Sequence, residues 1–160
     1  MKIRHATMED LKAITELEAL CFPPEEAAGY EAFQKRLQEF AECFWLLLEG
    51  DRLIAMVNGM ATDIPLLSDA MYEDAAMHRK DGEWQMIFGV LTHPGYQRQG
   101  YASMLLGRVI CDAKLAGRRG LVLTCKERLL PFYSEFGFQN EGVSQSVHGG
   151  AVWYDMRLTF

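Results

Sequence analysis

The stretch GVLTHPGYQRQGYASMLL, residues 89–106, joins an apolar run typical of a strand to a pattern typical of a helix. His-Pro-Gly ends the apolar run, and Gly100 stands just before the helical pattern. From there the apolar side chains recur every three or four residues, at Ala102, Leu105, Leu106, Val109, Ile110 and Ala113. The pattern predicts a long helix that begins near residue 101 and ends near Gly117.

The start of this helix has the features of an anion-binding turn. The first turn of a helix has four unpaired N–H groups and about half a unit of positive charge, so a phosphate can bind there. Gly100 lets the backbone approach such an anion, Ala102 keeps the turn small, and Arg98 can add charge-assisted hydrogen bonds. The alternative is an ordinary strand-to-helix turn in which the glycine only supplies a positive φ.

Outward from this junction, the whole chain has the pattern of a mixed α/β domain. Thr7 is predicted to cap the first helix, with Asp10 completing a capping box. The connector 61–83 is expected to carry some helix, and its acidic residues either line a site or form a solvated face. We expect one domain, residues 1–160, with helices around one sheet. The predicted strands are 2–5, 44–48, 53–59, 84–92, 121–125, 138 onward and 151–158, and the other predicted helices are 11–21, 30–40 and 129–136.

The composition argues against several classes of function. Of the 160 residues, 49% are apolar and 24% are charged, which is the balance of an ordinary soluble protein. The net charge of −6 argues against a nucleic-acid partner and suits a protein that handles cationic small molecules. No apolar run approaches the ~20 residues that span a membrane, and the charged start is unlike a signal peptide. The four cysteines have no metal-binding spacing, so we expect a reduced, cytoplasmic protein without a metal.

Several stretches of the sequence carry a family resemblance. The GxGxxG and Walker patterns are absent, whereas Gln97-x-x-Gly100-x-Ala102 matches (Gln/Arg)-x-x-Gly-x-(Gly/Ala) and so resembles the GNAT superfamily of acetyl-CoA-dependent N-acetyltransferases. EALCFPPEEAA (18–28), LVLTCKERLLPFYSEFGF (121–138) and HGGAVWYDMRL (148–158) look like the arylalkylamine (serotonin) N-acetyltransferase group and its bacterial relatives. The resemblance covers nearly the whole chain and is tightest from Trp84 to Phe138.

This resemblance implies a fold and a cosubstrate site. The implied fold is α/β and GNAT-like, with a mixed, mostly antiparallel sheet, a splayed central strand pair and flanking helices. Acetyl-CoA would lie in the gap between the two splayed strands, where one backbone amide of the strand would polarise the acetyl carbonyl. The start of the helix predicted near residue 101 would hold the pyrophosphate. Lys126 and Arg128 either contact the ribose phosphate or are simple surface charge. The expected cofactor-binding residues are Val90, Leu91, Thr92, Gln97, Arg98, Gln99, Gly100, Tyr101, Ala102 and Ser103.

The resemblance also implies one catalytic residue. Tyr133 matches the tyrosine beside the cofactor sulfur, where a phenol with a pKa near 10 can donate a proton to the leaving thiolate. The two strand histidines of the arylalkylamine enzymes are Met86 and Phe88 here, so the general base is left open. The candidates for that base are Glu26, Glu83 and Asp63. His148 has no partner in the sequence pattern, and Cys125 is expected to be structural.

The acceptor pocket implied by the same resemblance is aromatic and apolar, which suits an aryl, alkyl or polyamine-like primary amine. Because no residue qualifies as a covalent nucleophile, we expect direct attack of the amine in a ternary complex. Two alternatives stay open, namely a non-catalytic acetyl-CoA sensor and a protein or peptide N-acetyltransferase. The partner is expected to be a small amine, without nucleic acid or membrane, and the protein a monomer or homodimer. The expected substrate-binding residues are Phe22, Pro23, Pro24, Glu26, Met86 and Phe88.

Overall fold

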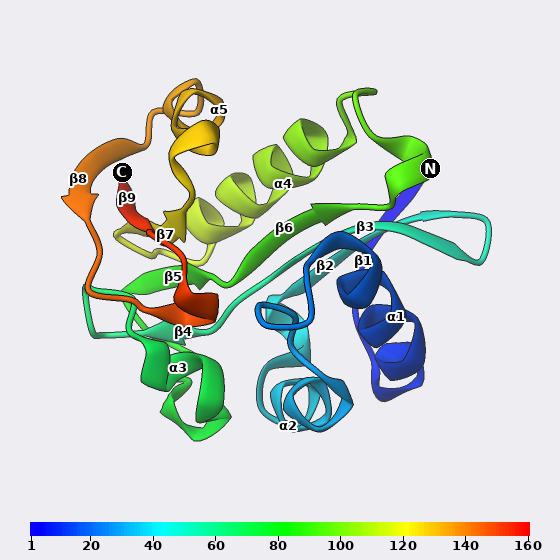
Figure 1. The fold of residues 1–160 in the computed structure, drawn as a ribbon. Coiled ribbons are helices and arrows are strands. Elements are labelled where there is room, and N and C mark those ends of the chain that lie inside the picture. Colours follow the sequence, from blue (N-terminus) through cyan, green and yellow to red (C-terminus); the bar gives the residue numbers. More distant parts are fainter.

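The computed structural model describes residues 1–160, in which helices cover both faces of a strongly splayed β-structure (Figure 1). Helices α1 and α2 lie on one side of the strands, and α4 and α5 lie on the other. The strands are β1 (Lys2–His5), β2 (Phe44–Glu49), β3 (Arg52–Asn58), β4 (Ala61–Thr62), β5 (Trp84–Ile87), β6 (Gly89–Thr92), β7 (Gly120–Cys125), β8 (Gln139–Val143) and β9 (Tyr154–Thr159). The α-helices are α1 (Leu11–Cys21), α2 (Tyr30–Phe40), α3 (Asp69–Glu73), α4 (Tyr101–Leu115) and α5 (Leu130–Ser134).

The strands form two sheets rather than the one sheet expected, because β6 and β7 do not pair, and this separation is the predicted splay. One sheet has the order β1-β2-β3-β6 and is entirely antiparallel. The other has the order β4-β5-β7-β9-β8, in which only β5 and β7 are parallel. Since β6 pairs with β3 alone, its other edge has no strand beside it and is free to pair with something else.

The first helices form where the sequence places their signals. The Thr7 side chain accepts the N–H of Glu9, and Asp10 accepts the N–H of Thr7, so the predicted capping box is present. Leu11, Ile14 and Leu17 bury one face of α1. The two prolines after α1 end that helix because proline cannot continue the hydrogen-bond ladder.

The predicted strand 84–92 is wrong as a single element, because the structure splits it into β5 and β6 at Phe88. The Phe88 N–H donates to the Asn58 carbonyl at 2.7 Å, although Asn58 faces Gly89 in the ladder. Phe88 and Gly89 therefore both lie opposite Asn58, which is the arrangement of a β-bulge. A β-bulge bends its strand away from the neighbouring strand. Gly59 lies against this bend, where an added Cβ would collide with the Met86 carbonyl oxygen.

A buried amide satisfies the backbone where the chain changes sheets. Gln85 is 1% exposed, and its Nε2 lies 2.9 Å from both the Gly59 and the Met86 carbonyl oxygens. These carbonyls would otherwise be buried without donors, which costs free energy. The polar residue inside an apolar strand thus stabilises the split that opens the sheet.

One hydrophobic core of 36 buried residues connects the two sheets and α1, α2 and α4. The connector 61–83 carries helix as predicted, in α3 and in a 3₁₀ turn at Ala75–Met77. Five further 3₁₀ turns lie at Met8–Asp10, Ala41–Cys43, Pro94–Tyr96, Glu127–Leu129 and His148–Gly150. No helix combines the length and the apolar character that crossing a membrane requires.

Candidate functional site

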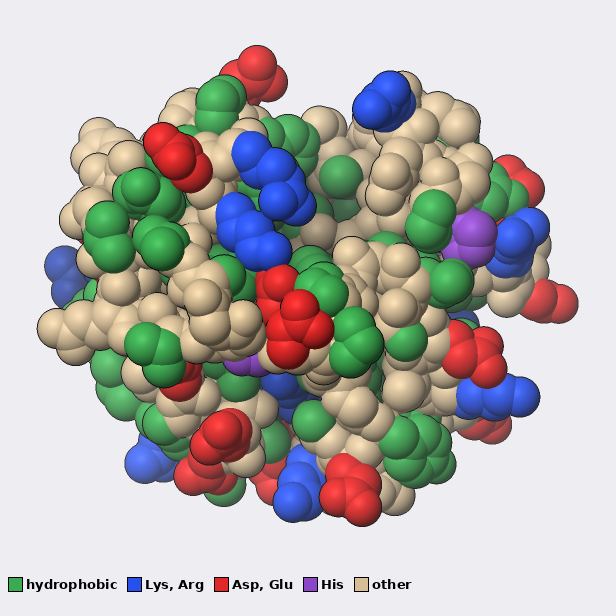
Figure 2. Space-filling view, in the orientation of Figure 1, with side chains coloured by type: hydrophobic (Ala, Val, Ile, Leu, Met, Phe, Trp, Pro, Cys, Tyr) green, Lys and Arg blue, Asp and Glu red, His purple; other side chains and the backbone are tan.

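Two cavities meet at Val90, on the free edge of β6. The larger has a volume of about 400 Å³ and the smaller about 350 Å³, and Val90 is the residue that lines both. The space-filling view shows a hollow over β6, bordered by Lys and Arg side chains with Asp and Glu side chains beside them (Figure 2). The two cavities therefore border the same residue on the edge that the splay of the sheets leaves unpaired.

The smaller cavity lies at the N-terminal end of α4. Gly100 has a φ of 83° and Arg98 a φ of 62°, so two residues of this turn adopt the left-handed conformation. The Met104 N–H donates to the Gly100 carbonyl, which leaves the N–H groups of the preceding turn without helical acceptors. The lining residues are Val90, Thr92, Tyr96, Gln97, Arg98, Gly100, Tyr101, Ala102, Ser103 and Phe132.

The backbone of β6 presents alternate amides to the free edge. The His93 N–H donates to the Ile54 carbonyl at 2.7 Å, so the residues at odd positions face β3 in the antiparallel ladder. By this alternation the N–H groups of Val90 and Thr92 face the cavities. The predicted cofactor residues Leu91 and Gln99 line neither cavity. Leu91 is buried in the core, and Gln99 is an exposed residue of the turn before α4.

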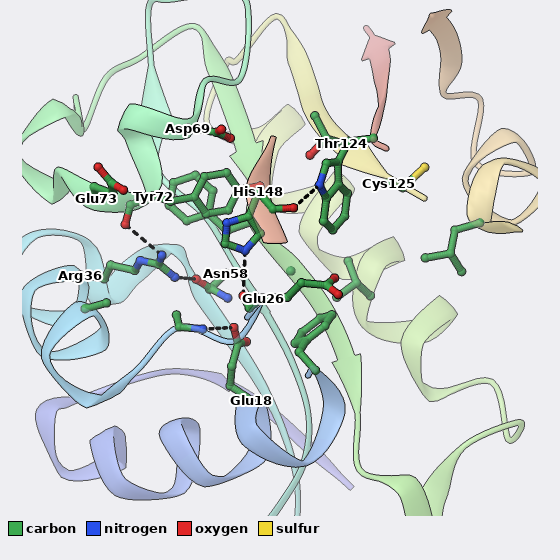
Figure 3. A pocket seen from close by; sticks show the side chains of 18 of the residues that line it. Glu18, Glu26, Arg36, Asn58, Asp69, Tyr72, Glu73, Thr124, Cys125 and His148 are labelled. Carbon is green, nitrogen blue, oxygen red and sulfur yellow. Dashed lines mark hydrogen bonds between the residues drawn. The ribbon is translucent and has the colours of Figure 1, made fainter. Parts of the chain in front are cut away.

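The larger cavity lies between α1, α2 and α3 on one side and β7 and the segment before β9 on the other. The close view shows Arg36 and Tyr72 at one end, Cys125 at the opposite end, and His148 and Glu26 between them (Figure 3). Its lining residues are Glu18, Phe22, Glu26, Ala28, Ala32, Arg36, Asn58, Asp69, Tyr72, Glu73, Phe88, Gly89, Val90, Thr124, Cys125, Leu129, Tyr133, Val147, His148 and Trp153.

Tyr133, the predicted catalytic residue, belongs to α5 and lines this cavity. Its side chain is 6% exposed, and burial, with Cys125 and Tyr72 nearby, raises its pKa above the usual range. The phenol therefore remains protonated at neutral pH and can act as a proton donor. Burial also raises the pKa of Cys125 to about 11, so this residue remains a thiol and is no ready nucleophile.

A histidine that the sequence pattern does not single out contributes to the cavity wall. His148 stacks on Tyr72 with 5.4 Å between ring centroids, and its Nε2 lies 2.8 Å from the Glu26 carbonyl oxygen. The preceding residues are held down by Asp69, whose carboxylate accepts the Ser146 hydroxyl and the Val147 N–H. The connector and the β8–β9 segment, 77 residues apart at this contact, thus close the cavity together.

Of the three predicted base candidates, only Glu26 lies at the cavity. Lys126 Nζ donates to Glu26 at 2.9 Å, so this lysine forms an ion pair at the cavity and is not simple surface charge. Glu83 forms an ion pair with Arg119, and Asp63 accepts the Glu83 N–H, both outside the cavities. The carboxylates that line the larger cavity are Glu18, Glu26, Asp69 and Glu73.

Two buried charges in the cavity are absent from the sequence-based set. Arg36 is 4% exposed and Glu18 is 7% exposed, and both line the larger cavity. Burial raises the pKa of Glu18 and lowers the pKa of Arg36. Both residues stand at helical spacing within the apolar stripe of their helices, between Ile14 and Cys21 and between Phe33 and Phe40. A charge in such a stripe is the signal that could have found them.

Three of the predicted substrate residues lie outside the larger cavity. Met86 belongs to β5 and is fully buried in the core. Pro23 and Pro24 do not line the cavity. Phe22, Glu26 and Phe88 do line it, so the aromatic half of the predicted pocket is present.

Outside the two cavities, a glutamate, a cysteine and a histidine lie close together, as they could at a metal site. The hydrogen bonds of the histidine are not those of a metal ligand. Glu42, Cys43 and His78 have their polar atoms within 4.8 Å of one another. His78 Nδ1 accepts the Ala61 N–H, so a neutral His78 carries its proton on Nε2, which lies 3.2 Å from Glu42. With both ring nitrogens engaged, the histidine has no lone pair left for a metal.

The chain matches one protein-family model and several curated proteins. The model of the Acetyltransferase (GNAT) family matches residues 11–138. The serotonin N-acetyltransferase of Mesocricetus auratus is 31% identical over 113 residues, which are 69% of this chain and 53% of that protein. The Homo sapiens serotonin N-acetyltransferase is 27% identical over 109 residues, 67% of this chain and 51% of that protein. The chain thus spans about half the length of these curated relatives.

Solved structures share the fold over the whole chain. The GphF GNAT-like decarboxylase in complex with isobutyryl-CoA has a TM-score of 0.86 at 20% identity, covering 99% of each chain. The PaiA N-acetyltransferase from Thermoplasma acidophilum in complex with coenzyme A has a TM-score of 0.73 at 14% identity, covering 99% of this chain and 98% of that one. At these identities the likeness concerns the fold.

Proposed function

Since this chain belongs to the acetyltransferase (GNAT) family, we propose that it transfers the acetyl group of acetyl-CoA to the primary amine of a small molecule. The observation that carries the proposal is the meeting of two cavities at Val90. A transfer in one ternary complex needs two substrates whose reacting atoms meet, and here one backbone position borders both spaces.

The smaller cavity fits the coenzyme. The free N–H groups at the start of α4, the left-handed Gly100 and the Arg98 guanidinium are suited to a pyrophosphate. The Thr92 N–H and the Val90 carbonyl on the unpaired edge of β6 can bind the amides of an extended pantetheine arm as a neighbouring strand would, which leaves the Val90 N–H for the acetyl carbonyl. The residues assigned to the coenzyme are Val90, Thr92, Gln97, Arg98, Gly100, Tyr101, Ala102 and Ser103.

The reaction balances with groups that this chain supplies. The amine nitrogen attacks the acetyl carbonyl carbon, so a C–N bond forms and the C–S bond to coenzyme A breaks. The Val90 N–H stabilises the oxygen charge that develops on the carbonyl. Tyr133 donates its phenolic proton to the departing sulfur and is reprotonated from solvent. The proton lost by the amine passes to a cavity carboxylate, directly or through water.

The larger cavity fits the amine. Aromatic side chains of Phe22, Tyr72, Phe88 and Trp153 form its walls, and carboxylates provide a place for an ammonium group. The relatives named as serotonin N-acetyltransferases support a small amine as the acceptor. The roof formed by α3 and the β8–β9 segment favours a small molecule over a protein, because a peptide chain needs an open groove.

Release of coenzyme A tests the proposal. Acetyl-CoA is incubated with arylalkylamines, alkylamines, polyamines, amino acids and short peptides, and free thiol is measured beside a Tyr133→Phe variant. Amine-dependent release, reduced in the variant, is expected. Tight binding of acetyl-CoA without release for any amine would favour the sensor alternative. Release only with peptides that carry a free lysine or N-terminus would favour the protein acetyltransferase.

A further inference from the structure

Arg36 is a buried cation without an acidic partner. Its side chain belongs to α2, is 4% exposed, and forms no ion pair with any carboxylate. The guanidinium carbon lies 5.2 Å from the ring centroid of Phe33, 5.9 Å from that of Tyr72 and 4.9 Å from that of Phe88. Aromatic faces lower the cost of burying the charge but leave its hydrogen-bond donors unused.

The donors of Arg36 are only partly satisfied. A guanidinium has five N–H donors. One Nη donates to the Tyr72 carbonyl at 3.1 Å, the other lies 3.4 Å from Asn58 Oδ1, and the buried Nε has no partner. A buried donor without an acceptor is costly, and the residue lines the larger cavity. The unused donors thus suit an acceptor group that arrives with a ligand.

The other charges around the cavity do not meet this need. Glu26 is paired with Lys126, Asp69 is occupied by Ser146 and Val147, and Glu73 forms no ion pair or hydrogen bond with Arg36. Glu18 is the second buried charge of the cavity, where one carboxylate oxygen accepts the Ala28 N–H at 2.9 Å. Glu18 and Arg36 lie beyond ion-pair distance of each other. The cavity therefore holds one buried acidic and one buried basic side chain that form no ion pair.

We propose that the acceptor of this enzyme is an amine that also carries a carboxylate, with Arg36 binding the carboxylate and Glu18 facing the ammonium group. The proposal rests on the acetyl transfer proposed above and names its substrate class. A carboxylate matches the planar guanidinium with two parallel hydrogen bonds, which a plain arylalkylamine cannot supply. Arg36 and Cys125 lie at opposite ends of the cavity (Figure 3), so the carboxylate would bind at the end remote from Cys125.

Matched ligand pairs provide the test, because they differ only in the carboxylate. The pairs are phenylalanine with 2-phenylethylamine, 4-aminobutyrate with n-propylamine, and 6-aminohexanoate with n-pentylamine, which vary the spacing between the two charges. Dissociation constants are measured by calorimetry with coenzyme A present, and kcat/KM is measured with acetyl-CoA. The proteins are the wild type, Arg36→Met, Arg36→Lys and Arg119→Met. Arg119 is a matched control, because its guanidinium also lies over an aromatic ring, that of Trp84 at 5.8 Å, but outside the cavities.

In the wild type and in Arg119→Met, at least one amino acid is expected to bind about tenfold or more tightly than its plain amine. Arg36→Met is expected to abolish this preference. Arg36→Lys is expected to retain part of it, because lysine keeps the positive charge but lacks the planar pair of donors that binds both carboxylate oxygens. Equal binding within every pair in the wild type would overturn the inference, and this comparison needs no folded variant. A preference that persists in Arg36→Met would overturn it as well.

The two proposals can fail separately in this experiment. A carboxylate preference that depends on Arg36, without any acetylated product, would contradict acetyl transfer and leave the Arg36 assignment in place. Acetylation of plain amines with no gain from the carboxylate would contradict the Arg36 assignment and leave acetyl transfer in place.

Discussion

Lys126 Nζ donates to the Glu26 carboxylate at 2.9 Å, and this contact joins the end of β7 to the segment that follows α1. The Glu26 side chain is 7% exposed and that of Lys126 is 27% exposed, so the pair is shielded from solvent. Lys126 also lies over the Trp153 ring, 5.6 Å from its centroid. The contact therefore ties together three segments that border the larger cavity.

Replacing Lys126 by methionine is expected to destabilise the protein by about 1–2 kcal/mol, because Glu26 is left as a buried charge without its cation. Urea unfolding measures the change. The double variant Lys126→Met/Glu26→Gln is expected to recover part of the loss, and Arg128→Met, at an exposed neighbouring position, is expected to change little. Equal losses in the single and double variants would show that the loss does not come from a Glu26 charge left without its cation.

Replacing Tyr133 by phenylalanine is expected to lower kcat about a hundredfold while the KM for acetyl-CoA stays within about twofold. The ring keeps its packing against Phe132 and Phe138, so only the proton donor is lost. Tyr154→Phe, on β9 and outside both cavities, serves as the control. An unchanged kcat would remove Tyr133 from the proposed chemistry.

Gly100→Ala is expected to weaken acetyl-CoA binding and to cost about 1 kcal/mol of stability, because alanine at a φ of 83° is strained. Gly50→Ala is the matched control. Both glycines have a positive φ, and at both an added Cβ would have no atom within 4 Å, but Gly50 lies in the β2–β3 turn. We expect similar stability losses by urea unfolding, with weaker binding by calorimetry only for Gly100→Ala. Equal affinities would contradict the role of this turn in holding the coenzyme.

Glu18→Gln is expected to become progressively more stable than the wild type as the pH rises. Burial raises the pKa of Glu18 above its usual 4.5, so the folded chain holds this proton more tightly than the unfolded chain. Below about pH 4.5, Glu18 is protonated in the wild type, so its burial does not destabilise the folded chain. The wild type loses stability as the pH rises through the pKa that Glu18 has in the folded chain. Urea unfolding at several pH values between about 4.5 and 7.5 measures the difference.

Glu16→Gln, at an exposed position on the same helix, is the control for this pH series. Its stability relative to the wild type is expected to stay constant across the range. A Glu18→Gln difference that is flat with pH, like that of the control, would mean that burial does not disfavour the Glu18 carboxylate.

The sequence predicts the order of the elements well, because their signals are local. The repeat from Ala102 to Ala113 defines most of α4, and the Thr7 capping box marks the start of the first helical segment. The split of strand 84–92 escapes this kind of prediction, because alternation of apolar residues continues through the bulge. Gly89, inside a strand pattern, is the available signal, since glycine in a strand often marks a bulge.

The site is predicted less completely than the fold, because its walls come from segments far apart in the chain. The α4 start and Tyr133 could be predicted, since each is contained in one short motif. His148 gains its role only by stacking on Tyr72, 76 positions away in the sequence, which no local pattern reveals. Arg36 and Glu18 carry a local signal, a charge within an apolar helical stripe, but its meaning depends on the cavity that the fold creates.

Acetyl transfer itself is tested most directly by following the acetyl group. Acetyl-CoA labelled with ¹³C in its acetyl carbonyl is incubated with the protein and the panel of amines and amino acids, and small molecules and intact protein are analysed by mass spectrometry. A labelled N-acetyl product in equal amount to the coenzyme A released is expected, with no label on the protein. Release of coenzyme A with the label in acetate or bound to the protein, and none in an amide product, would contradict acetyl transfer.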